Sequence, residues 1–149
     1  MPHVWKKNGF EISTDQKRVN FDFVHQELTK SYWSPGISKE MVVKAAQNSI
    51  IFGVYRETDG TQVGYARLIT DQTTFAYLAD VFIAEDERGK SLGTWLNECI
   101  IAHPELQNLR RWMLATRDAH ALYQKFGWKA LESPQRLMER HFPNIYNRL

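Results

Sequence analysis

The sequence predicts an α/β fold in which helices flank a mixed central β-sheet. Two runs rich in β-branched and aromatic residues, 49–56 and 62–69, lie on either side of a turn at residues 58–60, which reads Thr-Asp-Gly and is typical of an antiparallel hairpin. From Phe75 onward, strand-like and helix-like segments alternate, as they do where helices connect neighbouring strands. A hairpin followed by this alternation predicts one sheet that contains both strand orientations.

Each predicted element has its own local signal. A first short strand is followed by a helix that carries Phe21, Val24 and Leu28 on one side, and Ser38 is a suitable N-cap for a second helix. Gly127 is a natural stop for the last helix. In chain order we expect strand 10–13, helix 21–30, helix 38–47, strand 49–56, strand 62–69, strand 75–83, a helix with an apolar stripe over 92–103, strand 112–115 and helix 116–126.

Length and composition favour one domain over residues 1–149, because 149 residues with 43% hydrophobic content can bury one sizeable core. The net charge of +2 is too small to indicate a nucleic-acid partner. The single cysteine, Cys99, falls in the apolar helix stripe, so we expect it to pack rather than react, and it fits a reducing cytoplasm. Neither a run of about 20 apolar residues nor a signal-peptide core is present, so we expect a cytoplasmic protein without membrane contact.

The junction after the strand 75–83 predicts a phosphate-binding loop. Residues 88–94 are basic and rich in small side chains, and they open a helix whose first backbone N–H groups and dipole favour an anion. A nucleotide P-loop would need glycine where Ala84 stands, and the three glycines of a dinucleotide fingerprint are missing. The sequence therefore predicts a phosphate or pyrophosphate site of a different kind.

Two segments resemble one known family. The run RGKSLG at 88–93 is similar to the pyrophosphate loop of the GCN5-related N-acetyltransferases (GNAT), Arg/Gln-x-x-Gly-x-Gly/Ala, with Ser91 at the first pattern glycine. Downstream, AHALYQKFGW at 119–128 resembles that family's A-x-x-L-Y-x-x-x-G-F segment, and Thr116 stands where the family usually has asparagine. Both matches occur in the expected order and context, and the resemblance covers residues 53–128.

The resemblance implies a GNAT-like acyl-CoA N-acyltransferase fold and an N-acetyltransferase that uses acetyl-CoA as co-substrate, without a metal. It implies direct attack of a primary amine on the thioester in a ternary complex. Carried onto this chain, the pantetheine arm would pair with backbone before the loop, and the phosphates would meet the loop itself. The cofactor-binding residues expected on this basis are Val81, Phe82, Ile83, Arg88, Gly89, Lys90, Ser91, Leu92, Gly93, Thr94 and Thr116.

Tyr123 and Asp80 are the expected catalytic residues. Tyr123 matches the family tyrosine that protonates the leaving thiolate, although it could instead anchor its helix by packing. Alternation along a strand places Asp80 on the face of Leu78 and Phe82, where a carboxylate is costly unless paired or functional. The resemblance favours a general base there; the alternative is a structural ion pair with an arginine such as Arg67.

The acceptor site is the least defined by sequence. By resemblance it would use the loop between the first two helices and the central strands, which here supply Tyr32, Trp33, Arg67 and Tyr77. A small-molecule amine is the expected acceptor. Alternatives are a non-catalytic acyl-CoA-binding or regulatory domain, or an acetyltransferase that acts on a protein or tRNA. A homodimer is left open.

Overall fold

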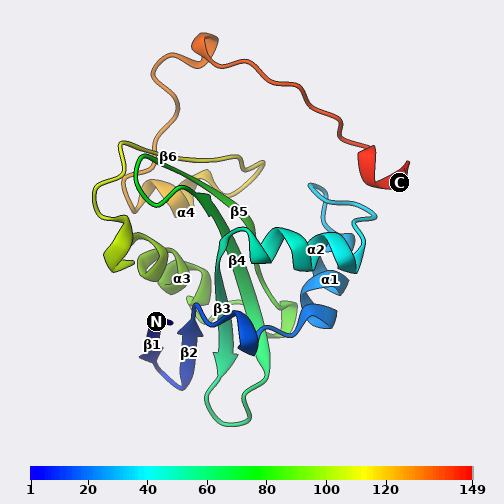
Figure 1. Cartoon of the computed structure of the whole chain (residues 1–149). Helices are drawn as coiled ribbons and strands as arrows, with labels where there is room; N and C mark the ends of the chain where they lie inside the picture. The colour runs from blue at the N-terminus through cyan, green and yellow to red at the C-terminus, as the bar shows by residue number, and fades with distance from the viewer. Residues whose placement is uncertain (149) are drawn as a thin grey trace.

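The computed structural model describes residues 1–148. Within them, six strands form one sheet in the order β1-β2-β3-β4-β5-β6, and neighbouring strands are antiparallel except for the parallel pair β5–β6 (Figure 1). The predicted mixed sheet is therefore confirmed. The strands are β1 (Val4–Lys7), β2 (Phe10–Ser13), β3 (Ile50–Arg56), β4 (Gln62–Thr70), β5 (Phe75–Ile83) and β6 (Arg111–Leu114).

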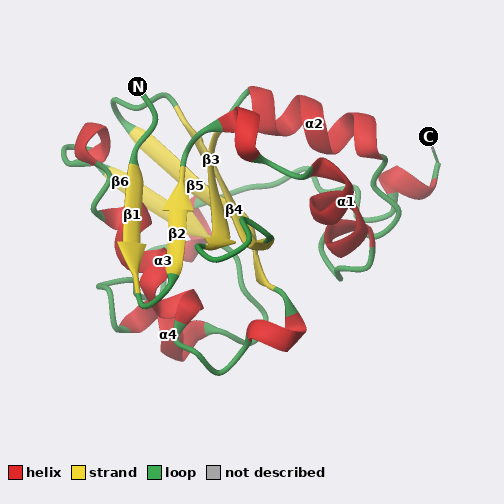
Figure 2. Ribbon diagram, turned by 90° about the horizontal axis from the view of Figure 1, so that it is seen from below, coloured by secondary structure: helices red, strands yellow, loops and turns green. Residues whose placement is uncertain are grey.

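Helices cover both faces of the sheet (Figure 2). The helices α1 (Phe21–Thr29) and α2 (Lys39–Gln47) pack on one face around an apolar cluster that includes Val24, Val42, Ile51 and Tyr65. The helices α3 (Leu92–Ile101) and α4 (His120–Gln124) pack on the other face around a second cluster that includes Phe52, Leu68, Leu96 and Ile100. The two clusters divide the core into two layers separated by the sheet.

Local capping explains where the first helices begin. The Asn20 side chain accepts a hydrogen bond from the Phe23 amide, and Ser38 accepts one from the Met41 amide, as the sequence predicted for Ser38. The expected helix 116–126 is shorter in the structure, because the Thr116 hydroxyl accepts the Ala119 amide hydrogen in a preceding turn. Strand β1, which the sequence analysis did not predict, completes the sheet edge.

Cys99 is a packing residue, as expected. It is 3% exposed in the α3 layer of the core. Burial raises the pKa of its thiol to about 12, which leaves it protonated at neutral pH.

A β-bulge at Asp80 overturns the predicted face of this residue. Arg67 of β4 pairs with Ala79 and Tyr65 pairs with Phe82, so one residue of β4 lies opposite two of β5. Asp80 takes a left-handed backbone with φ +55°. The bulge shifts the alternation by one residue, so Leu78 faces the α3 layer while Phe82 faces the α1–α2 layer. Asp80 therefore does not share a face with both.

The chain after Trp128 forms no strand within the described residues. It leaves α4, crosses above the sheet and ends beside α1 and α2 (Figure 1). Residues 134–145 are exposed, and Tyr146 is half-buried again. We call residues 129–148 the C-terminal strap. No helix among residues 1–148 is long and apolar enough to cross a membrane.

Candidate active site

The predicted phosphate loop opens α3 with its backbone groups available. Ser91, the N-cap residue, has φ +61° and its side chain makes no capping hydrogen bond to a described residue. The first amides of a helix lack intrahelical partners, so they can meet a ligand. The left-handed backbone at Ser91 also explains why the family pattern has glycine there, since glycine adopts this region without strain.

Gly93, in the first turn of α3, has space beside it. A Cβ added there would meet only the Leu122 Cδ2 atom, at 4.0 Å, among the described residues. The packing of the protein itself does not require glycine at this position. A ligand that approaches the backbone closely would require it.

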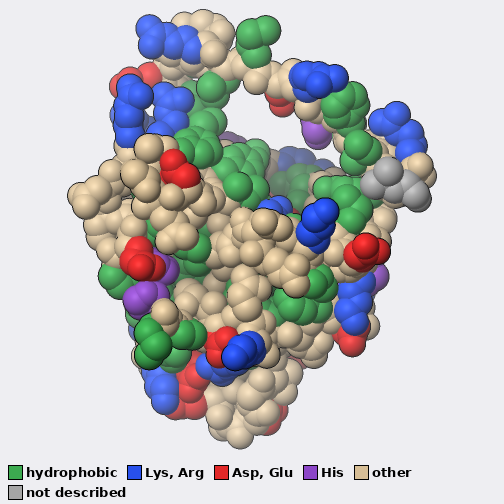
Figure 3. All heavy atoms as spheres, in the orientation of Figure 1, with side chains coloured by type: hydrophobic (Ala, Val, Ile, Leu, Met, Phe, Trp, Pro, Cys, Tyr) green, Lys and Arg blue, Asp and Glu red, His purple; other side chains and the backbone are tan. Residues whose placement is uncertain are grey.

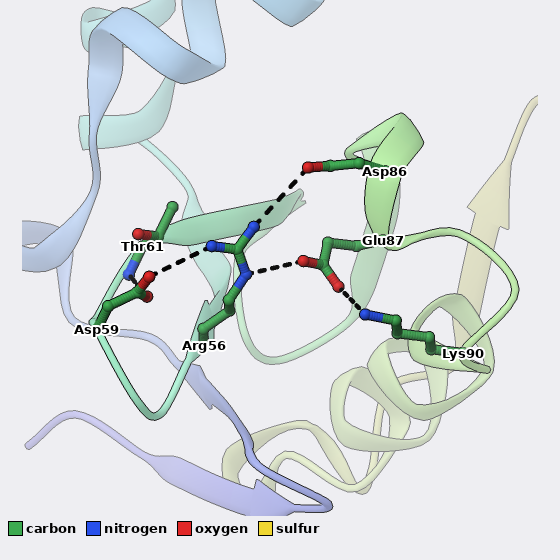
Figure 4. Close-up of polar contacts among 6 residues, drawn as sticks. All are labelled: Arg56, Asp59, Thr61, Asp86, Glu87 and Lys90. Carbon is green, nitrogen blue, oxygen red and sulfur yellow. Dashed lines mark hydrogen bonds and ion pairs between the residues drawn. The ribbon is translucent and has the colours of Figure 1, made fainter.

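A network of charged side chains holds the start of the loop (Figure 4). The Arg56 Nε donates to Glu87 at 2.7 Å, and the Lys90 Nζ donates to the other Glu87 oxygen at 2.6 Å. Lys90 and Arg56 thereby lower the pKa of the buried Glu87 carboxyl. The Lys90 ammonium is thus bound by Glu87. We therefore expect a phosphate to meet the backbone of Lys90 and not its ammonium group.

The other basic residue of the loop is also engaged. Arg88 donates its Nε hydrogen to the Ile83 carbonyl at 3.1 Å, and its side chain is exposed. This bond ties the loop back to the end of β5. The rest of the side chain is exposed, three residues before the N-cap residue Ser91.

Strands β5 and β6 separate beside this loop. β6 pairs with β5 only from Phe75 to Leu78 in the described chain, so beyond Leu78 β5 keeps only its antiparallel partner β4, and we call this unpaired edge the gap between β5 and β6. The side chains of Val81 and Ile83 pack into the α3 layer, and Phe82 packs against Phe23 with ring centres 5.6 Å apart. The side chains at 81–83 therefore serve the core, and any contact with a ligand here would use their backbone.

Asp80 forms a short ion pair. One carboxylate oxygen accepts from Arg67 Nε at 2.7 Å, and the other accepts from Trp33 Nε1 at 3.0 Å. Arg67 also donates to the Ser49 hydroxyl at 3.3 Å. Asp80 is 9% exposed, so this is a nearly buried pair. Both oxygens are thus bound by side chains of the protein itself, which favours the structural alternative over a general base.

Tyr123 lies at a cavity of about 310 Å³ between the end of β6, α4 and the start of the strap. Its ring packs edge-on against Trp128, with centres 5.9 Å apart. Burial, and secondarily the nearby Tyr32, raise the pKa of the Tyr123 hydroxyl. Thr116 and His120 also line this cavity. Tyr123 thus presents a protonated hydroxyl at a pocket that is partly open to solvent.

The acceptor residues gather on the open part of the sheet face. Tyr32 and Trp33 are stacked edge-on in the loop after α1, with centres 5.0 Å apart. The amide of Arg117 donates to the Tyr32 hydroxyl at 3.2 Å, and its guanidinium carbon lies 3.9 Å from the Tyr32 ring centre. Tyr77 is half-buried on β5, two residues from Ala79, the partner of Arg67.

Three contributors to this site were missed by sequence reasoning. Glu87 could have been suspected from its spacing of three residues before Lys90. Arg117 and the strap carry no local signal, because their partners lie far away in the sequence.

The comparisons with known proteins agree with this geometry. Residues 12–128 match the model of the acetyltransferase (GNAT) family. A Gibberella zeae protein named as a putative acetyltransferase is 33% identical over 83% of this chain and 81% of its own length. The crystal structure of a Xanthomonas campestris pv. campestris protein, named as a putative acetyltransferase of the GNAT family, is 39% identical, with a TM-score of 0.90 over 95% of this chain and 99% of that chain.

More distant structures share the fold. A Clostridium acetobutylicum protein, named as a predicted acetyltransferase and solved with acetyl-CoA, has a TM-score of 0.64 at 13% identity, over 95% of this chain and 96% of that one. This chain is thus similar to acetyltransferases over most of its length. It contains a β5–β6 pairing that ends at Leu78, an α3 N-terminus without a side-chain cap, and Tyr123 at a pocket. The chain belongs to the acetyltransferase (GNAT) family and is an acetyltransferase.

Proposed function

We propose that this protein transfers the acetyl group of acetyl-CoA to a primary amine of a small molecule by direct attack in a ternary complex. The observation that supports the proposal is an α3 N-terminus without a side-chain cap soon after β5, together with a β5–β6 pairing that ends at Leu78 and a pocket that Tyr123 lines with residues of β6. A pyrophosphate would lie at Gly93, and the thioester arm would follow the backbone of residues 81–83.

The proposed chemistry uses few side chains. Acetyl-CoA supplies the activated acyl group. The neutral amine nitrogen attacks the thioester carbonyl carbon, a C–N bond forms and the C–S bond breaks. The Tyr123 hydroxyl gives its proton to the departing sulfur and regains one from water, while the amine releases a proton to water. The ordinary tyrosine pKa of about 10 already keeps this hydroxyl protonated at neutral pH, and burial raises the pKa further, so the proton is present for the departing sulfur.

Asp80 has a positioning role in this proposal. Its bonds to Arg67 and Trp33 fix a guanidinium and an indole on the acceptor side of the gap. An aromatic surface beside a partly neutralised arginine suits an amine with an apolar or anionic part. Proton removal from the acceptor is assigned to water.

A transfer assay tests the proposal. The purified protein would be given acetyl-CoA with an aliphatic diamine, an amino acid, an amino sugar phosphate or an arylalkylamine, and CoA thiol release would be followed. Amine-dependent release with matching N-acetylated product supports the proposal. Tight acetyl-CoA binding without transfer to any amine would instead favour the non-catalytic binding domain, and a kinetically competent acetylated enzyme would contradict direct attack.

A further inference from the structure

The C-terminal strap connects the two sides of the proposed site. At its beginning, Lys129, Ala130 and Leu131 line the same cavity as Tyr123. At its end, the short turn Ile145–Asn147 lies against α1 and α2, where Tyr146 packs on their apolar cluster. The strap thus runs from the tyrosine side of the gap to the acceptor side.

The end of the strap rests on the loop that carries the acceptor residues. The Asn147 side-chain oxygen occupies the space that a Cβ at Gly36 would need, and Gly36 has φ +79°. Gly36 belongs to the same loop as Tyr32 and Trp33. The strap therefore contacts this loop at Gly36, while Asp80 and Arg117 bind its residues Trp33 and Tyr32.

Arg136 and Leu137 of the strap still line a cavity with Trp112 and Met113 of β6, and beyond them the strap is exposed up to Ile145. Residues 134–145 are exposed, and Met138 is 97% exposed. The space-filling view shows an opening between the strap and the body of the protein (Figure 3). The sheet face toward the α1–α2 layer also retains exposed surface, since Ile69 of β4 is 41% exposed. The strap and the body together form a closed ring around this opening.

We propose that the strap is a specificity-determining element that admits small amines to the site and keeps folded proteins away from it. This inference rests on the proposed function. A small molecule can pass through a ring of chain, but the convex surface of a folded protein cannot bring a lysine side chain to the thioester while the ring is closed. The strap would also keep Tyr32 and Trp33 in place for the acceptor.

Two variants open the ring in different ways. The double variant Tyr146→Ala and Asn147→Ala releases the distal end, and a truncation after Ser133 removes the rest of the strap. Met138→Ala is the matched control, because it lies in the same strap and is almost fully exposed. For each protein we would measure acetyl transfer to the four small amines and to lysozyme as a folded, lysine-bearing acceptor, acetyl-CoA affinity, thermal unfolding and mass in solution.

The inference predicts that wild type and Met138→Ala acetylate a small amine but not lysozyme. The released variant should acetylate lysozyme at a rate at least about tenfold above the background measured with wild type, with a KM for the small amine several-fold higher and unchanged acetyl-CoA affinity. If truncation prevents folding, the double variant decides the matter.

Three results would overturn the inference. One is a folded double variant with wild-type acceptor selectivity. Another is wild-type transfer to lysozyme, which would leave acetyl transfer intact but remove the exclusion. The third is a dimer that becomes monomeric on release with unchanged selectivity, which would assign the strap to subunit contact. Wild type that acetylates no amine at all contradicts the proposed function itself, and with it this inference.

Discussion

The loop after β5 and the loop after α1 are held in place in different ways. Most partners of the first lie close in the sequence: Lys90 contacts Glu87, and Arg88 contacts Ile83. The second has local backbone bonds, such as that from the Gly36 amide to the Thr29 carbonyl, but its side chains Trp33 and Tyr32 bind partners 47 and 85 positions away. The cofactor side is therefore built locally, whereas the acceptor side depends on distant parts of the chain. Substitutions far from the site can therefore change which acceptor amine is bound while leaving acetyl-CoA binding intact.

The largest expected effect concerns Tyr123, which belongs to neither loop. Tyr123→Phe should lower kcat about 100-fold or more, since it removes the proposed proton donor, while acetyl-CoA affinity changes little. Tyr55→Phe is the matched control, because the Tyr55 hydroxyl is also buried but has no partner in the described structure. Steady-state kinetics and calorimetry measure both. Equal turnover in the two variants would remove Tyr123 from the reaction.

On the acceptor side, Asp80→Asn should lower the free energy of unfolding by about 2 kcal/mol, since it leaves the Arg67 guanidinium partly buried without its counter-charge. KM for the amine should rise more than kcat falls. Denaturant unfolding and kinetics measure these effects. The double variant with Arg67→Gln should lose less stability than the two single losses added together. Additive losses would mean that the pair does not act as a unit.

On the cofactor side, Gly93→Ala should separate stability from binding. Alanine is the better helix former by about 0.5–1 kcal/mol, and the neighbouring atoms leave room for its Cβ. Acetyl-CoA affinity should nevertheless fall about tenfold, because the methyl group enters the space proposed for the pyrophosphate. Glu98→Ala, on the exposed side of the same helix, is the control. Undiminished affinity in Gly93→Ala would mean that the ligand does not approach α3 here.

The smallest effect concerns the pH dependence of the same region. Lys90 and Arg56 lower the pKa of folded Glu87, so their contribution to stability is complete above the ordinary glutamate pKa and is lost as the pH falls through the folded value. The melting temperature of Glu87→Gln should therefore fall less than that of wild type between neutral and acidic pH. Parallel melting curves across this range would show that the network contributes nothing to stability.

This difference also sets the limit of sequence reasoning. Strand β5, the loop at 88–93 and the Gly127 helix stop have local signals, and the structure contains them. The face of Asp80 was predicted from strict alternation along the strand. The bulge adds an extra residue that breaks this alternation, and the pattern of residues in β5 does not show where that happens.

Long-range contacts were the other limit. Arg56 meets Glu87 across 31 positions, and Tyr146 returns to α1 and α2 from the far end of the chain. Such contacts are fixed by the packing of the whole sheet and not by the residues near them. Arg67 was named as a partner for Asp80 only as an alternative, and the geometry now favours it.

The most direct test of the account is a calorimetric titration of the purified protein with acetyl-CoA, with ATP and NAD as controls. The open α3 N-terminus and the gap between β5 and β6 predict selective, micromolar binding of acetyl-CoA at one site per chain. A folded protein that binds no acetyl-CoA, or binds ATP equally well, would contradict the assignment of this loop and of the chemistry proposed beside it.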